Sequence, residues 1–330
     1  MSEIRFLTSS DEHISDLAVG YRKDDYRSAI LGKIAWQGLE AQRFNANAVL
    51  RGGDLFHVKR PGSNSMRTLA TLARIHRSYH CPTYALAGNH DITNNDLETV
   101  PSQPLGVLLK SEVLRELTEE NFVSGSMKVR VVGVPYTTDL EVGGLQELVR
   151  KKDETYTVAV VHALAAMAPP EKIQSFFNEK IFDYRDLVFD GCPDVYIFGH
   201  YHKDQGIVDH LGVKFVNLGA ISRGALTLEN LERKPKVSLI KFDSRGVSVE
   251  ESIVPHDDPL KVFDLEKKKT VEKQRASLDD FIKKLRADSN VSDDASIESK
   301  KKELDKYPDD LKKLCLDILE EAESGGMDDD

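Results

Sequence analysis

Five short clusters of aspartate, histidine and asparagine follow apolar, strand-like runs in the first two thirds of this 330-residue chain. Clusters behind successive strands constrain the fold, because ligands of open α/β sheets collect at the carboxyl ends of the strands. Seven oxygen and nitrogen donors at one such edge are enough to hold two divalent metals, which suit hydrolysis of a phosphate ester. The clusters are SDEH at 10–13, GGDLFH at 52–57, GNHD at 88–91, VVHAL at 160–164 and FGHYH at 198–202.

Strands and helices are predicted to alternate over the first 90 residues. Helical spacing predicts helices at 25–44 and 64–78, and short apolar runs predict strands at 4–10, 48–51 and 83–87. This order indicates parallel strands with helices covering the sheet. We expect an α/β fold, a four-layer α/β/β/α sandwich of two mixed sheets flanked by helices, with a short helical C-terminal appendage. Its second sheet would come from strand-like runs at 128–136, 155–164, 194–199, 212–218, 236–242 and 247–254.

The strand pattern stops at Pro255, which predicts one catalytic domain over 1–255 and a helical, acidic region over 256–330. That region holds 15 Lys+Arg against 22 Asp+Glu, so it accounts for −7 of the net charge of −10. Helices are expected at 260–286 and 309–323. The second carries an apolar stripe that suits either packing on its own domain or docking of a partner. The stripe consists of Leu311, Leu314, Cys315, Ile318 and Leu319.

Composition narrows the class of protein. With 40% hydrophobic and 30% charged residues, the chain has the make-up of a folded globular protein. No apolar run approaches the roughly 20 residues of a membrane span, and the N-terminus turns polar too early for a secretory signal. Cys81, Cys192 and Cys315 are isolated, which indicates a reducing, cytoplasmic setting. The part before the tail is nearly neutral, so charge neither supports nor excludes DNA as a partner.

Each cluster alone has a structural alternative. A D-x-H sequence is common, Asp54 could cap a helix, GNHD is a good turn sequence, and His162 could be a core histidine. The ordered set at strand ends, with His200 and His202 two apart on an extended segment, favours a metal site. Carboxylate, carboxamide and imidazole donors suit manganese, iron or zinc better than calcium. Asp54 is the best candidate for a bridging ligand, because Gly52 and Gly53 before it allow a tight turn.

The ordered motifs resemble the calcineurin-like metallophosphoesterase superfamily. Within it, GGDLFH followed by KRPGSNS and then LAGNHD is similar to the SbcD-type nuclease subunits of bacteria and phages, which act in DNA repair and recombination. The resemblance covers about residues 4–223. It implies a metal-dependent hydrolase that acts on DNA as an exonuclease and single-strand endonuclease, in a bacterial or phage-infected cytoplasm.

The resemblance also implies a role for each site residue. Two divalent metals, expected to be Mn²⁺, would share Asp54. His90 would contact the scissile phosphate and stabilise or protonate the leaving oxygen, and His57 would lie near the active site. The first metal would be held by Asp11, His13, Asp54 and His202. The second would be held by Asp54, Asn89, His162 and His200.

Two features depart from the family pattern. The first motif lacks the leucine-glycine pair that often follows it. The region after Pro255 is shorter than the capping domain of larger relatives, which puts selection of double-stranded DNA in doubt. Arg223, in NLGAISRG at 217–224, is a candidate substrate contact, with a surface salt bridge as the alternative.

The resemblance further implies partners. An SbcC-type ABC ATPase would bind through helices near the C-terminus, DNA would be the substrate, and a homodimer would form through helices of the N-terminal half. Two other functions stay open. One is a stand-alone nucleotide phosphodiesterase or phosphatase, and the other is a non-catalytic scaffold that keeps only the fold.

Overall fold

The structure is a computed structural model that describes residues 2–169, 179–224 and 226–270. The chain divides into two compact units, Met1–Phe263 and Asp264–Asp330. Nearly all of the second unit lies outside the described residues, and so does the apolar stripe predicted at 311–319. The boundary predicted after Pro255 therefore stays a prediction. No helix among the described residues is long and apolar enough to cross a membrane.

The first sheet has six strands in the order β14-β13-β1-β2-β3-β4. Strands β1 to β4 run parallel, whereas β13 and β14 are antiparallel to their neighbours. The last two described strands, which were expected in the second sheet, thus complete the sheet that the first strand begins, because β13 pairs with β1. The bounds are β1 (Ile4–Ser9), β2 (Ala48–Arg51), β3 (Thr83–Ala85), β4 (Arg115–Glu116), β13 (Lys236–Asp243) and β14 (Gly246–Ile253).

The second sheet also has six strands, in the order β11-β12-β10-β7-β6-β5. Its four central strands are parallel and its two edge strands antiparallel. The central strands are buried on both faces, which explains their near-continuous apolar sequences. They are β6 (Met127–Val134), β7 (Tyr156–His162), β10 (Val195–Gly199) and β12 (Val213–Leu218), with edges β5 (Glu119–Ser124) and β11 (Asp204–His210). A separate small ladder joins β8 (Ala165–Ala166) and β9 (Phe182–Asp183).

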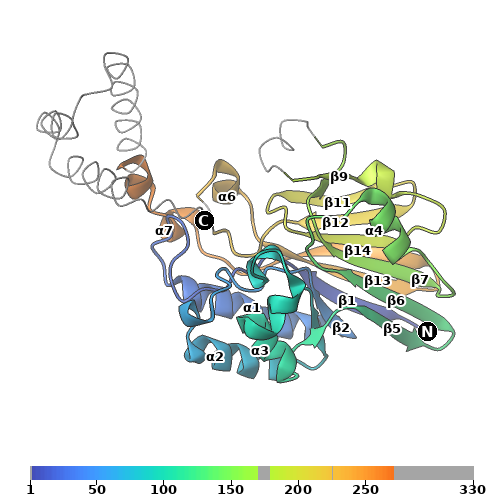
Figure 1. Cartoon of the computed structure of the whole chain (residues 1–330), viewed down its shortest axis with the longest axis horizontal. Coiled ribbons are helices and arrows are strands. Elements are labelled where there is room, and N and C mark those ends of the chain that lie inside the picture. The colour runs from blue at the N-terminus through green and yellow to red at the C-terminus, as the bar shows by residue number, and fades with distance from the viewer. Residues whose placement is uncertain (1, 170–178, 225, 271–330) are drawn as a thin grey trace, which may run out of the picture. The chain divides into compact units, whose positions relative to one another are not determined.

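Helices α1 (Tyr26–Phe44), α2 (Met66–Arg77) and α3 (Pro104–Lys110) lie together on the first sheet, and α4 (Val142–Val149) lies on the second (Figure 1). Asp25 caps α1 by accepting the Ser28 N–H. Ser65 caps α2, which starts at Met66, two residues later than the start predicted at residue 64. The short α6 (Leu228–Glu232) and α7 (Pro259–Val262) follow, and 3₁₀ turns include η2 (Asn89–Asp91) and η3 (Leu97–Ser102).

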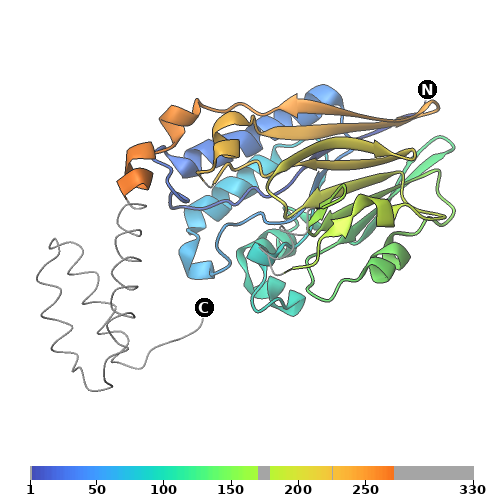
Figure 2. The ribbon, with the colours of Figure 1, turned by 90° about the horizontal axis from the view of Figure 1, so that it is seen from above.

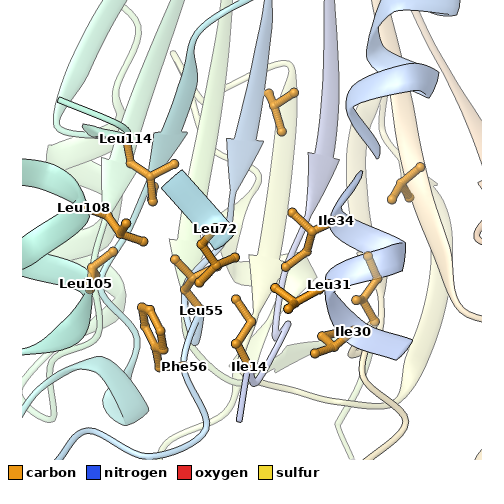
Figure 3. Close-up of a cluster of buried hydrophobic side chains, with 14 of the residues drawn as sticks. Ile14, Ile30, Leu31, Ile34, Leu55, Phe56, Leu72, Leu105, Leu108 and Leu114 are labelled. Atoms are coloured by element: carbon orange, nitrogen blue, oxygen red, sulfur yellow. The ribbon is translucent and has the colours of Figure 1, made fainter. Parts of the chain in front are cut away.

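Three clusters of buried apolar side chains fill the spaces between the layers. One, drawn in Figure 3, packs Leu31, Ile34 and Leu72 of the helices onto the first sheet. The second lies between the sheets and includes Phe6 and Val160. The third covers the outer face of the second sheet beneath α4. The predicted four-layer sandwich of two mixed sheets is therefore confirmed, and Figure 2 shows its layers from above.

The helix predicted at 260–286 is interrupted. Phe263 has an extended backbone, is fully buried, and pairs with Arg22 in an isolated β-bridge. The burial of this aromatic side chain against the first unit outweighs the helical periodicity of the local sequence. Described helix resumes at residue 265.

Candidate metal centre

The loops after five strands meet where the carboxyl ends of both sheets come together. β1, β2 and β3 of the first sheet are followed by Asp11, Asp54 and Asn89, while His162 ends β7 and His200 follows β10. The loops touch closely, since a Cβ on Gly199 would lie 2.3 Å from the carbonyl oxygen of Gly52. Side chains far apart in the sequence therefore share one site.

One group of donors lies around Asp54 and His13. His13 Nε2 is 2.9 Å from His202 Nε2 and 3.7 Å from Asp54 Oδ2, and His202 Nε2 is 3.6 Å from Asp11 Oδ1. One ligand atom from each of these four residues fits within a 4.8 Å span. The structure thus brings together all four residues predicted for the first metal.

A second group shares Asp54 with the first. One donor each from Asp54, His162 and His200 falls within 4.8 Å. His162 Nε2 lies 3.5 Å from Asp54 Oδ1 and 3.3 Å from Asn89 Oδ1. All four residues predicted for the second metal are therefore in one place, with the Asp54 carboxylate between the two groups.

These donors fit two divalent cations. Ligands at about 2.1 Å from one metal lie roughly 3 to 3.5 Å apart in octahedral or tetrahedral geometry. The spacings above cluster around this range, and several are too long for hydrogen bonds. Asp54 Oδ2 is buried and has no hydrogen-bond partner in the described part of the chain, which suits an oxygen meant for a cation.

The backbone of the site is strained to place these donors. Asp11, His13, Asp54 and His200 have positive φ angles of 55°, 48°, 54° and 82°. A left-handed conformation costs a non-glycine residue about 1–3 kcal/mol and clusters at functional sites. It also corrects one expectation, because the turn at His200 replaces the extended segment predicted for FGHYH. The turn sends His200 and His202 to different donor groups.

Two glycines leave room for the ligands. A Cβ on Gly88 would lie 2.1 Å from Asp54 Oδ1, and one on Gly53 would lie 2.2 Å from His162 Nδ1. Gly53 also has a φ of 100°, which favours glycine. Both positions are too crowded for any side chain without displacing a candidate ligand.

Asp91, the last residue of GNHD, holds the loops together and is not near enough to join either donor group. Its carboxylate accepts the backbone N–H groups of Leu55, Phe56 and Gly88, each at 3.1 Å. It thereby ties the loop that carries Asp54 to the loop that carries Asn89. Burial, followed by the charge of Asp54, raises the pKa of Asp91 to about 7.

Neighbouring charges shift the pKa values of residues in the site. Burial alone would raise the pKa of Asp54, but His162 and His13 outweigh it and hold that pKa far below its usual value. Burial would lower the pKa of His162, yet the Asp54 carboxylate raises it to about 9. His162 Nδ1 donates to the carbonyl of Gly52 at 2.6 Å, so Nε2 is the nitrogen that faces Asp54.

His57 and His90 lie beside the first donor group. Their rings stack with centroids 5.6 Å apart, and both face His13, at 5.5 and 4.8 Å. His90 Nδ1 donates to the carbonyl of His57 at 2.8 Å, and the His90 N–H donates to Asp54 Oδ1. With His13 they line a cavity of about 340 Å³ that also includes His202 and Arg233.

Three residues near the site carry no motif in the sequence. Arg233 reaches the cavity from just after α6, where its Nε donates to Asn230 and its Nη1 is buried without a partner among the described residues. Glu179 accepts from His200 Nε2 at 2.8 Å, and Tyr136 lies 3.3 Å from the same carboxylate. Each is a single charged or aromatic residue outside any recognisable motif, which is too weak a signal to single it out from the sequence.

Arg223 is elsewhere. It lines a different cavity, is 1% exposed, and donates to the backbone carbonyl of Asp257 at 2.8 Å. No carboxylate of the described residues forms an ion pair with it, so the alternative of a surface salt bridge is wrong. Burial is the physical reason, since the loop after β12 turns this side chain inward.

The chain is similar in sequence to one protein with a role in DNA repair. The chain is 24% identical over 231 residues to the DNA double-strand break repair protein Mre11 of Archaeoglobus fulgidus. The match spans 64% of this chain and 49% of the relative, so it covers about half of that protein's length.

Two solved structures from Thermus thermophilus are also similar. The protein TT1561 has a TM-score of 0.45 and 15% identity, and the similarity covers 76% of this chain and 99% of that protein. The sulfate thiohydrolase SoxB has a TM-score of 0.45 and 13% identity, and the similarity covers 77% of this chain and 57% of that protein.

The family match covers most of the site. Residues 4–204 match the sequence pattern described as calcineurin-like phosphoesterase, a stretch that contains every candidate metal ligand. Members of this family are hydrolases that use divalent metals, in agreement with two donor groups joined by one carboxylate. The chain belongs to the calcineurin-like phosphoesterase family.

Proposed function

We propose that this chain is a two-metal phosphodiesterase that acts on DNA, the nuclease subunit of an SbcCD-like complex in repair, recombination or replication. The observation that carries the proposal is the stacked pair of His57 and His90 beside the donor groups that share Asp54. A histidine at the position of His57 is typical of the nuclease branch. The similarity to a protein named for double-strand break repair supports the same branch.

The metals are proposed to be Mn²⁺. Asp11, His13, Asp54 and His202 would hold one, and Asp54, Asn89, His162 and His200 the other. When bound, they would activate water and neutralise charge that develops on the phosphoryl oxygens. Mixed carboxylate, carboxamide and imidazole donors suit this metal.

The proposed role of His90 is to act on the leaving group. Because a carbonyl can only accept, the hydrogen bond to His57 O assigns a proton to His90 Nδ1 and leaves Nε2 for the substrate. A protonated His90 can give its Nε2 proton to the leaving oxygen. Burial and the charge of His90 lower the pKa of His57 to about 4, so His57 stays neutral and packs against His90.

The cavity beside His57 and His90 also contains a positively charged side chain that could contact the substrate. Arg233 lines the same space as His57 and His90, and its planar guanidinium suits a phosphate oxygen. We propose Arg233 as a substrate contact. We also propose two partners on the resemblance alone. An SbcC-type ATPase would bind through residues 307–330, and a homodimer would form through N-terminal helices.

One assay separates this function from a stand-alone phosphodiesterase or phosphatase. The full chain with Mn²⁺ is offered single- and double-stranded DNA beside a chromogenic phosphodiester, with and without an SbcC-type ATPase. Degradation of DNA is the expected result. Hydrolysis of the small ester with inert DNA, even with the ATPase, would favour the stand-alone enzyme, and no hydrolysis of any ester would favour a scaffold.

A further inference from the structure

Three basic side chains are buried together near, but outside, the metal centre. Arg22, Lys33 and Arg223 are 8%, 6% and 1% exposed, and we call them the cationic cluster. They come from the segment that leads into α1, from α1 itself and from the loop after β12. All three line one cavity of about 420 Å³, which also reaches Ser28 and His256.

Most of the positive charge of the cationic cluster is not neutralised by the protein. Lys33 Nζ donates to the carbonyl of Ile221 at 2.7 Å, and Arg223 Nη2 to that of Asp257 at 2.8 Å. Arg22 donates to the carbonyl of Ser222 at 2.8 Å, and within the described ranges it alone of the three forms an ion pair, with Asp24. Carbonyl groups satisfy N–H donors but carry no net charge.

Arg223 has spare donors at this cavity. Its Nε and Nη1 are buried and have no hydrogen-bond partner within the described ranges. Buried N–H donors without partners are unfavourable, and a ligand or an ion in the cavity would satisfy them. Burial and the positive charges of Arg22 and Arg233 lower the pKa of Arg223 to about 10, and burial lowers the pKa of Lys33 well below its usual value.

The N-terminal end of α1 adds to the positive electrostatic potential of this cavity. Ser28 and Ala29, in the first turn, line the cavity. That turn contains no acidic residue after the cap residue Asp25, so no carboxylate within the turn offsets the positive end of the helix dipole. The carboxylates that line the cavity are Asp24, which is paired with Arg22, and the exposed Asp257.

We propose that the cationic cluster is a binding site for a phosphate group, separate from the metal centre. Two guanidinium groups and the amino group of Lys33 around one cavity supply the N–H donors that a tetrahedral dianion or a phosphodiester requires. The site lies next to the cavity that His57 and His90 line, since Ser222 lines that cavity and the next residue, Arg223, lines this one. It can therefore hold either free phosphate or the backbone of a bound strand.

The first test is thermal unfolding of the full chain in EDTA, which keeps phosphate from binding through metals. Inorganic phosphate is compared with chloride at equal ionic strength. We expect phosphate to raise Tm by about 2–4 °C more than chloride at concentrations well above Kd. Lys33→Met should abolish this difference, and it should not unfold the chain because an apolar side chain of similar length replaces a buried polar one. Lys110→Met, at an exposed lysine of α3, is the matched control.

A second variant changes charge without touching the buried core. Ser28→Asp places a carboxylate at the exposed cavity rim, where it would neutralise the cationic cluster and repel phosphate. It should also abolish the phosphate-specific rise in Tm. Equal rises in phosphate and chloride for the unmodified chain would overturn the proposal, as would an undiminished phosphate effect in both variants.

Measurements of DNA binding distinguish a phosphate of the DNA backbone from free phosphate as the occupant of the site. The affinity of each protein for a single-stranded oligodeoxynucleotide without terminal phosphates is measured by fluorescence anisotropy in EDTA. A several-fold loss in Lys33→Met but not in Lys110→Met would assign the site to the DNA backbone. Unchanged affinity together with a lost Tm effect would assign it to free phosphate. Failure of the proposed nuclease function would appear separately, as absence of metal-dependent hydrolysis in the unmodified chain.

Discussion

At the scale of single residues, the metal centre depends on backbone conformations that most residues other than glycine avoid. Four candidate ligands adopt left-handed backbone angles, and neighbouring loops hold them there. The Asp11 N–H donates to Gly53 O, and the His13 N–H donates to Asp54 O. Such hydrogen bonds between loops allow one strand end to set the position of ligands on the next.

His90→Ala tests the division between ligands and other histidines. We expect turnover to fall by about 10²- to 10⁴-fold, because a proton donor to the leaving oxygen is lost, while metal affinity changes little. Isothermal titration with Mn²⁺ and hydrolysis of a small diester measure the two effects. His210→Ala, in β11, is the control. Normal turnover in His90→Ala would remove the role assigned to this side chain.

Gly88→Ala tests the close packing of Asp54. A methyl group at this position would lie 2.1 Å from Asp54 Oδ1 and 2.5 Å from Asp54 N, so the carboxylate must move. We expect metal affinity to fall by about 10- to 100-fold, in the range seen when a ligand's support is disturbed. Gly62→Ala is the matched control, because nothing lies within 4 Å of its added Cβ. Equal metal affinity in both variants would contradict the prediction.

At the scale of elements, a buried polar network joins β1, β2 and α2 beneath the centre. Arg51 of β2 pairs with Glu12, which lies between Asp11 and His13, and donates to His76 of α2 at 3.1 Å. Glu12, Arg51 and His76 are all at most 5% exposed. We infer that this network orients the first motif, since Glu12 stands between Asp11 and His13 in the chain and its carboxylate is held by Arg51 and Ser9.

His76 should make stability depend on pH. Burial and Arg51 lower its pKa to about 3, whereas its ordinary value is 6.5. The unfolded chain therefore binds a proton that the folded chain does not, and this contribution to stability is lost as pH falls from 6.5 towards 3. For His76→Gln in EDTA, the loss between pH 5.5 and 4.5 should be smaller than in the unmodified chain by about 1.4 kcal/mol. Urea unfolding at each pH gives the free energy of unfolding of both proteins. An equal change of this free energy with pH in the two proteins would contradict the lowered pKa of His76.

At the scale of the whole molecule, every candidate ligand and all three apolar clusters lie in the unit Met1–Phe263. That unit includes β13 and β14, which complete the first sheet beside β1. Any shortening of the chain before Phe263 would therefore expose the core of the catalytic unit.

Truncation after Phe263 tests whether this unit is sufficient for chemistry. We expect Mn²⁺-dependent hydrolysis of a small diester to stay within about twofold of the full chain, because a compact unit with its own core can fold alone. Association with an SbcC-type ATPase should be lost, as measured by co-purification. A folded but inactive truncation, judged by circular dichroism, would show that residues after 263 take part in catalysis.

The sequence by itself determined the strands behind the motifs and the four-layer class. Predicted strand ranges at 48–51 and 194–199 agree with β2 and β10 to within a residue, because apolar runs bounded by glycine depend on local chemistry. It also indicated the donor set, since ligand types recur at strand ends. Only the tertiary structure decided that β13 and β14 join the first sheet, that His200 turns away from His202, and that Arg223, Arg233 and Glu179 lie where they do. These outcomes arise from contacts between residues distant in the chain, whose energies leave no local pattern in the sequence.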